Sequence, residues 1–110
     1  MSSLIEEICQ KVLSEQFEFS KHAVDQSILR RIRVHEIKEV IANGQLIEDY
    51  PTDKYGSSCL IFGLTQAGRV IHVQCSYPIR PLIKIITVYE PHPERWNDNF
   101  TRRRISSDGK

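Results

Sequence analysis

The sequence predicts an α+β domain, in which two or three N-terminal helices pack on one face of a small, curved antiparallel sheet of about four strands. Apolar residues recur at helical spacing as far as Ala42, and segments rich in β-branched residues, separated by short turns, follow. Helices first and strands afterwards is the order typical of this class. The length of 110 residues corresponds to one domain.

Each expected helix has its own start or stop signal. Ser2 or Ser3 can cap the first helix, and Ser20 can cap the second after a short extended run, while Asn43-Gly44 ends the third. The apolar positions of the first helix are Leu4, Ile5, Ile8, Val12 and Leu13, and the other two helices are expected over Lys21–Arg31 and Val34–Ala42.

Four strands are expected over Gln45–Tyr50, Ser58–Thr65, Arg69–Tyr77 and Leu82–Glu90. The hairpin loop Gln66-Ala67-Gly68 indicates antiparallel pairing, and the apolar second strand is expected to be central. Phe17–Phe19 is interpreted as a short strand or an extended entry to the second helix. These elements predict an N-terminal helix over residues 1–16, the main domain over 17–97, and a basic, flexible tail over 98–110.

Composition limits the classes of protein to consider. The formal net charge of +1 provides no global field for nucleic acid, although arginines cluster at 30, 31 and 33 and again over Arg102–Arg104. Three widely spaced cysteines without a CxxC motif indicate reduced thiols rather than a disulfide framework. The acidic N-terminus is unlike a signal peptide, and no apolar run approaches the roughly 18 residues of a membrane span. We therefore expect a cytoplasmic protein without membrane contact.

Three residues are candidates for acid–base chemistry. His22 lies in the first turn of a predicted helix, where the helix dipole favours a neutral imidazole or a bound anion. His72 lies on the polar face of the third predicted strand, and Tyr89 ends the fourth. The structural alternatives are a histidine packed between helix and sheet, an exposed strand residue and a tyrosine at the edge of the core.

Several cationic side chains are candidates for phosphate binding, chiefly Arg30, Lys84 and Arg80. A solvated surface charge is the alternative for each of them. His22, Asp53 and His72 lack the tight spacing of a metal site, and no glycine-rich phosphate loop is present. No metal or cofactor is therefore expected.

Several short motifs, in this order, resemble those of a known family. They are Ser20-Lys21-His22-Ala23, Arg30-Arg31-Ile32, Glu36-Ile37, Tyr50-Pro51-Thr52-Asp53-Lys54, Ser58-Cys59-Leu60, Ile71-His72-Val73 and Thr87-Val88-Tyr89-Glu90-Pro91, closing with Trp96. The set resembles the domain-of-unknown-function family numbered 4258 over about Phe17–Trp96. That family is distantly similar to the RelE/ParE-like toxin superfamily, which includes the BrnT and MqsR toxins.

The resemblance implies a RelE-like fold and the toxin of a toxin–antitoxin system that cleaves RNA without a metal. The implied partners are RNA and a small antitoxin, of zinc-finger type, and a homodimer is possible. In this hypothesis His72 and His22 act as base and acid, Tyr89 orients the phosphate or donates a proton, and the three cations hold phosphate. The family often has arginine where this chain has Gln26. The alternative is therefore a catalytically inactive interaction module of the same fold.

Overall fold

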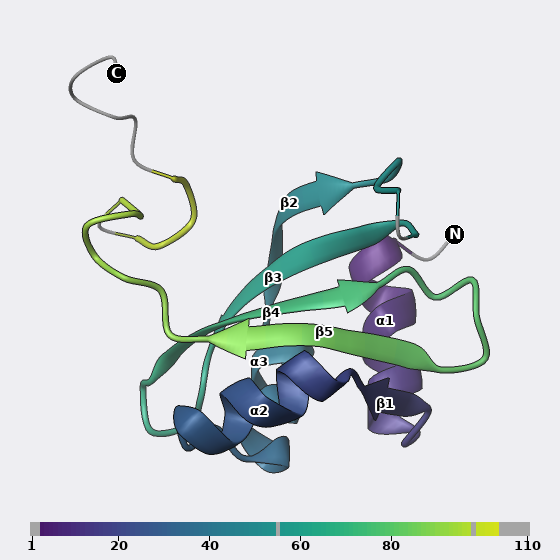
Figure 1. Cartoon of the computed structure of the whole chain (residues 1–110), viewed down its shortest axis with the longest axis horizontal. Coiled ribbons are helices and arrows are strands. Elements are labelled where there is room, and N and C mark those ends of the chain that lie inside the picture. Colours follow the sequence, from purple (N-terminus) through teal and green to yellow (C-terminus); the bar gives the residue numbers. More distant parts are fainter. Residues whose placement is uncertain (1–2, 55, 98, 104–110) are drawn as a thin grey trace.

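The structure, a computed structural model, describes residues 3–54, 56–97 and 99–103 (Figure 1). Three helices and five strands form an α+β domain. In chain order they are α1 (Leu4–Leu13), β1 (Phe17–Phe19), α2 (Lys21–Leu29), α3 (Val34–Ala42), β2 (Gln45–Tyr50), β3 (Ser58–Leu64), β4 (Val70–Ser76) and β5 (Ile83–Tyr89). The predicted helices and the four predicted strands all form. The ends of the strands and of the second and third helices shift by at most two residues, and α1 spans Leu4–Leu13 within the expected residues 1–16. Within the described residues, no helix has the length and apolar character that spanning a membrane requires.

The sheet has five strands in the order β1-β5-β4-β3-β2. Strands β2 to β5 pair antiparallel, and β3 is internal as predicted. The sheet was expected to be antiparallel with about four strands, but it has a fifth strand, β1, that pairs parallel with β5. Backbone hydrogen bonds of 2.9 Å from Ile83 to Gln16 and from Ser20 to Ile85 extend this pairing. The extended entry to α2 thus becomes an edge strand, and the sheet is mixed.

The helices and one face of the sheet enclose the core. Ser20 caps the start of α2. Its hydroxyl accepts from the N–H of Ala23 at 3.0 Å and donates to the carbonyl of Ile86 in β5 at 2.8 Å. This pair of bonds fixes the start of α2 against β5, and α2 continues from β1 along that strand (Figure 1). The buried side chains include Ile8, Val12, Ala23, Ile37, Val40, Ile41, Cys59, Ile61, Ile71, Val73, Cys75, Ile83, Ile85 and Val88.

Arg69, immediately before β4, connects four elements through one guanidinium group. Its Nη2 donates to the carbonyl of Arg30 at 2.6 Å, and its Nη1 donates to the carbonyl of Arg31 at 2.9 Å, beyond the end of α2. It also pairs with Glu36 of α3 at 3.2 Å and with Glu90, after β5, at 2.7 Å. Hydrogen bonding to Glu90 is the main cause that raises the pKa of Arg69. The carbonyls of the two residues that follow α2 thereby gain hydrogen-bond donors at the end of the helix.

A close approach between α3 and β3 sets the spacing of the two layers and requires glycine at position 63. A Cβ at Gly63 would lie 2.5 Å from the carbonyl oxygen of Val40 and 2.9 Å from its Cα. Because both atoms belong to the backbone, the clash is relieved only by moving the helix away from the sheet.

We predict that Gly63→Ala lowers the free energy of unfolding by about 2 kcal/mol, through overpacking at the helix–sheet contact. The comparison variant is Gly68→Ala, where the added Cβ meets no atom within 4 Å but the backbone has a φ of +84°. In that variant the free energy of unfolding should fall by only about 1 kcal/mol, because alanine is strained in the left-handed backbone conformation. Urea unfolding measures both, and equal losses would contradict the packing argument.

Candidate functional site

His72 lies at the centre of the sheet face that the helices leave uncovered. In β4 it stands opposite Phe62 of β3 and Tyr89 of β5. The side chain is nevertheless fully buried, because the segment after β5 folds back over it. The ring of Trp96 packs edge-on against the imidazole, with the ring centroids 4.4 Å apart at 84°. The sequence predicted that His72 lies on an open, polar face of the sheet, but in the structure this position is covered.

The hydrogen bonds of His72 determine its tautomer. The carbonyl oxygen of Phe100 lies 2.7 Å from Nε2 and can only accept, so Nε2 carries the proton. Nδ1 is then the acceptor for the hydroxyl of Tyr89, at 3.2 Å. Burial lowers the pKa of His72, more than the Phe100 bond raises it. At neutral pH the ring is accordingly an uncharged base directed at Tyr89.

Tyr89 forms one wall of a pocket of about 470 Å³. The other lining residues are Arg30, Glu90, His92, Arg95, Trp96 and Arg103. Desolvation raises the pKa of Tyr89 to about 12, so the phenol keeps its proton at neutral pH. The single carboxylate of the pocket, Glu90, is paired with Arg69. Among the described residues, the guanidinium groups of Arg30 and Arg95 have no carboxylate partner. The pocket is thus positively charged and suited to an anion.

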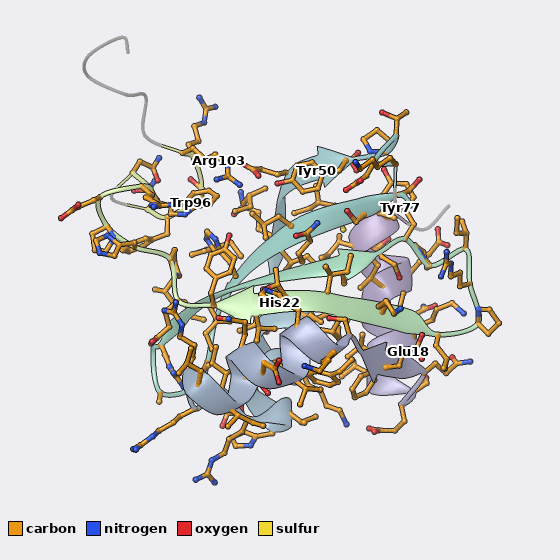
Figure 2. The ribbon with its side chains drawn as sticks, viewed as in Figure 1. Glu18, His22, Tyr50, Tyr77, Trp96 and Arg103 are labelled. Atoms are coloured by element: carbon orange, nitrogen blue, oxygen red, sulfur yellow. The ribbon has the colours of Figure 1, made fainter. Side chains whose placement is uncertain are left out.

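Arg103 fastens the C-terminal segment to the sheet. Its guanidinium lies 4.8 Å above the ring of Trp96 and pairs with Glu48 of β2 at 2.8 and 3.1 Å. The hydroxyl of Tyr50 donates to the same carboxylate. Burial acts to raise the pKa of Glu48, but the bonds from Arg103 and Tyr50 lower it overall. Figure 2 shows Trp96, Arg103 and Tyr50 gathered on one side of the molecule. Trp96 therefore docks on the body of the domain as expected, and Arg103 within the predicted tail is anchored.

The structure brings together three of the predicted site residues. Arg30 and Tyr89 line the same pocket, and His72 bonds to Tyr89 from beneath it. Lys84 and Arg80 line a second pocket of about 110 Å³, beside Ser76 and Tyr77.

The remaining sequence candidates lie outside both pockets. His22 is exposed on the first turn of α2 (Figure 2), and Gln26 is partly exposed on the same helix. His22, Asp53 and His72 do not gather, and among the residues that the structure describes, no group of three or more His, Cys, Asp or Glu is arranged to hold a metal ion. Of the tail predicted over 98–110, residues 98 and 104–110 lie outside the described residues.

His92 and Arg103 line the pocket although the sequence did not single them out for the site. His92 lies in the turn after β5, where its Nδ1 accepts from the backbone N–H of Glu94 at 3.1 Å. Its neutral ring therefore carries the proton on Nε2. Arg103 belongs to a stretch that reads as a basic tail. No local sequence pattern marks either residue as part of the site, because each reaches the pocket only through the path that the chain takes after β5.

The chain matches a protein-family model. The model described as a domain of unknown function (DUF4258) covers residues 19–90, from the last residue of β1 to the residue after β5. No curated protein and no solved structure matches the chain. The matched region includes α2, α3, β2 to β5, and therefore His72, Tyr89, Arg30 and Arg69. Since the match spans well over half of the sequence, the chain belongs to the DUF4258 family.

Proposed function

We propose that the protein is a toxin-type, metal-independent endoribonuclease, an mRNA interferase of RelE-like fold, acting at the pocket beside Tyr89. The observation that carries this proposal is the hydrogen bond between Tyr89 and the buried neutral imidazole of His72, at the wall of a pocket with three arginines. A proton acceptor next to an anion-binding surface is the combination that cleavage by the RNA's own 2′-hydroxyl requires.

The first step is removal of the 2′-hydroxyl proton through a relay. The hydroxyl oxygen of Tyr89 takes that proton and passes its own proton to Nδ1 of His72. The resulting imidazolium keeps its Nε2 bond to the carbonyl oxygen of Phe100, which becomes charge-assisted and stronger. The 2′-oxygen then attacks the adjacent phosphorus, so the nucleophile comes from the substrate.

The second step is departure of the 5′-oxygen. The guanidinium groups of Arg30 and Arg95 stabilise the charge that develops on the phosphate. His92 lies in the same pocket, where its Nε2–H can donate a hydrogen bond to the departing oxygen while that oxygen takes its proton from a water molecule. In this scheme His92 stands where the sequence suggested His22, because His22 does not line the pocket.

The proposal includes the partners and the compartment of a toxin. RNA is the substrate, a small antitoxin of zinc-finger type neutralises the protein, and both act in the cytoplasm. These elements are what the resemblance to RelE-like toxins, noted from the sequence, would imply. Growth arrest on expression, relieved by the product of a neighbouring gene, is the observation that tests them.

A second candidate function is a catalytically inactive interaction module. The specific observation in its favour is that His72 is 0% exposed and that protein groups engage both of its ring nitrogens. In this reading the Tyr89–His72 bond stabilises the sheet and the pocket binds without cleaving.

Replacement of the Tyr89 hydroxyl separates the two candidates. We expect Tyr89→Phe to lower kcat for cleavage of single-stranded RNA by about 10²- to 10⁴-fold, in buffer containing EDTA, because the relay loses its middle oxygen. The matched control is Tyr77→Phe, which removes a hydroxyl bonded to Asp49, at a residue of the second pocket, and should leave kcat unchanged, whatever its effect on KM. Native-like cleavage by a folded Tyr89→Phe protein would contradict the relay, and absence of cleavage by the unmodified protein would favour the module.

The pH dependence should report the buried base. Because burial lowers the pKa of His72, the ring stays neutral to a lower pH than a free imidazole. We expect kcat/KM to fall on acidification with a midpoint below about 6.5, as protonation of His72 blocks the relay. The variant His92→Gln should lower kcat and retain this acidic limb. An acidic limb centred above that value would assign the base to another group.

The salt dependence of binding tests the phosphate contacts. We expect Arg30→Gln to weaken RNA binding and to reduce the slope of log K against log salt by about 0.7 per lost contact. Lys84 and Tyr89 are five residues apart on β5, a span of about 17 Å. An RNA strand that follows β5 therefore reaches both pockets, and Lys84→Gln should reduce the slope similarly. An unchanged slope in Lys84→Gln would limit RNA to the Tyr89 pocket.

A further inference from the structure

The corner between α2 and α3 exposes apolar side chains among cations. Ile28 and Leu29, at the end of α2, are each 71% exposed, and Val34, at the start of α3, is 48% exposed. Arg31, Arg33 and His35 lie between and beside them in the chain. We call these six residues the α2–α3 corner. Large aliphatic side chains exposed to this degree contribute little to the core, and three of them close together in the chain indicate a surface that another molecule covers.

Arg31 occupies a backbone conformation that favours glycine. Its φ is +55°, and it follows the last turn of α2. The backbone N–H of Arg31 bonds to the carbonyl of Ile28 at 3.2 Å, and that of Ile32 bonds to Ser27 at 2.8 Å. This is the pattern of a Schellman motif, in which the left-handed residue is usually glycine. An arginine at this position destabilises the fold relative to glycine, so its side chain requires another explanation.

A pocket at the corner places Arg31 beside further cationic groups. It has a volume of about 310 Å³ and is lined by Arg31, Arg33, His35, Glu36 and Arg69. Glu36, its one carboxylate, accepts from the backbone N–H of Arg33 at 2.9 Å and pairs with Arg69 at 3.2 Å. Since this acid is already neutralised from within, the remaining charge of Arg31 and Arg33 faces outward and is positive. The pocket has room for a carboxylate side chain and a charge that attracts one.

We infer that the α2–α3 corner is a docking site for an acidic amphipathic segment of a partner protein. A carboxylate of the partner enters the pocket between Arg31 and Arg33, and its apolar face covers Ile28, Leu29 and Val34. The apolar residues favour a protein over a nucleic acid, which would leave exposed aliphatic side chains without complementary contacts. The inference is independent of ribonuclease activity, because none of these six residues lines the Tyr89 pocket.

A synthetic amphipathic helix with one glutamate face and one leucine face is the probe. We expect it to bind the full chain and to shift the backbone amide NMR signals of residues 28–35. Arg31→Gly should weaken this binding about tenfold, through loss of a charge-assisted hydrogen bond, and should raise the urea midpoint of unfolding. A merely structural role for Arg31 would not produce these opposite changes in one variant.

The controls separate charge, apolar contact and nucleic acid. A peptide with glutamine in place of glutamate, and one with serine in place of leucine, should each bind at least about tenfold more weakly. Arg102→Gln removes an exposed arginine elsewhere and should leave peptide binding unchanged. Equal binding of the glutamine peptide, an unaffected Arg31→Gly, or displacement of the peptide from residues 28–35 by polyuridylate would overturn the proposal.

Discussion

The guanidinium group of Arg69 holds in place the elements from which both candidate surfaces are built. It closes the carbonyl end of α2, pairs with Glu36 at the start of α3 and binds Glu90 at the end of β5. Hydrogen bonds to charged groups each contribute roughly 1.5–3 kcal/mol when they are partly shielded from water. With one side chain, the fold fixes the helix corner on one side and the Tyr89 pocket on the other. Arg69 therefore helps to hold these two surfaces in their relative positions, although neither surface is formed by it alone.

Most of the fold could be predicted because its signals are local. Ser20 caps α2, Asn43-Gly44 ends α3, and Gln66-Ala67-Gly68 turns between β3 and β4, and each acts on its immediate neighbours. The position of β1 was not predicted, since a three-residue strand has almost no pattern and its partner lies far along the chain. Arg69 was also missed, because its four partners come from three separate stretches of sequence.

The candidate site was predictable in its parts and not in its arrangement. Period-two alternation placed His72 on the sheet face away from the core, and strand-end position singled out Tyr89; the register that pairs them agrees. The sequence contains no sign that Trp96 and Phe100 bury that histidine, nor that His92 and Arg103 join the pocket. These contacts depend on the path of the chain after β5. Such a path is set by packing and by the Arg103–Glu48 pair rather than by any local pattern.

The parallel pairing of β1 with β5 has a consequence for the folding pathway. Phe17–Phe19 precedes nearly the whole domain in the chain, yet its hydrogen-bond partner is the last strand. The edge of the sheet therefore closes only after β5 has been synthesised and paired with β4. Long-range contacts of this kind slow folding, because the loop between the partners must be ordered before the contact stabilises it. A nascent chain that ends before Ile83 would hold β1 without its partner, so completion of this sheet is expected to be a late step in the folding of the domain.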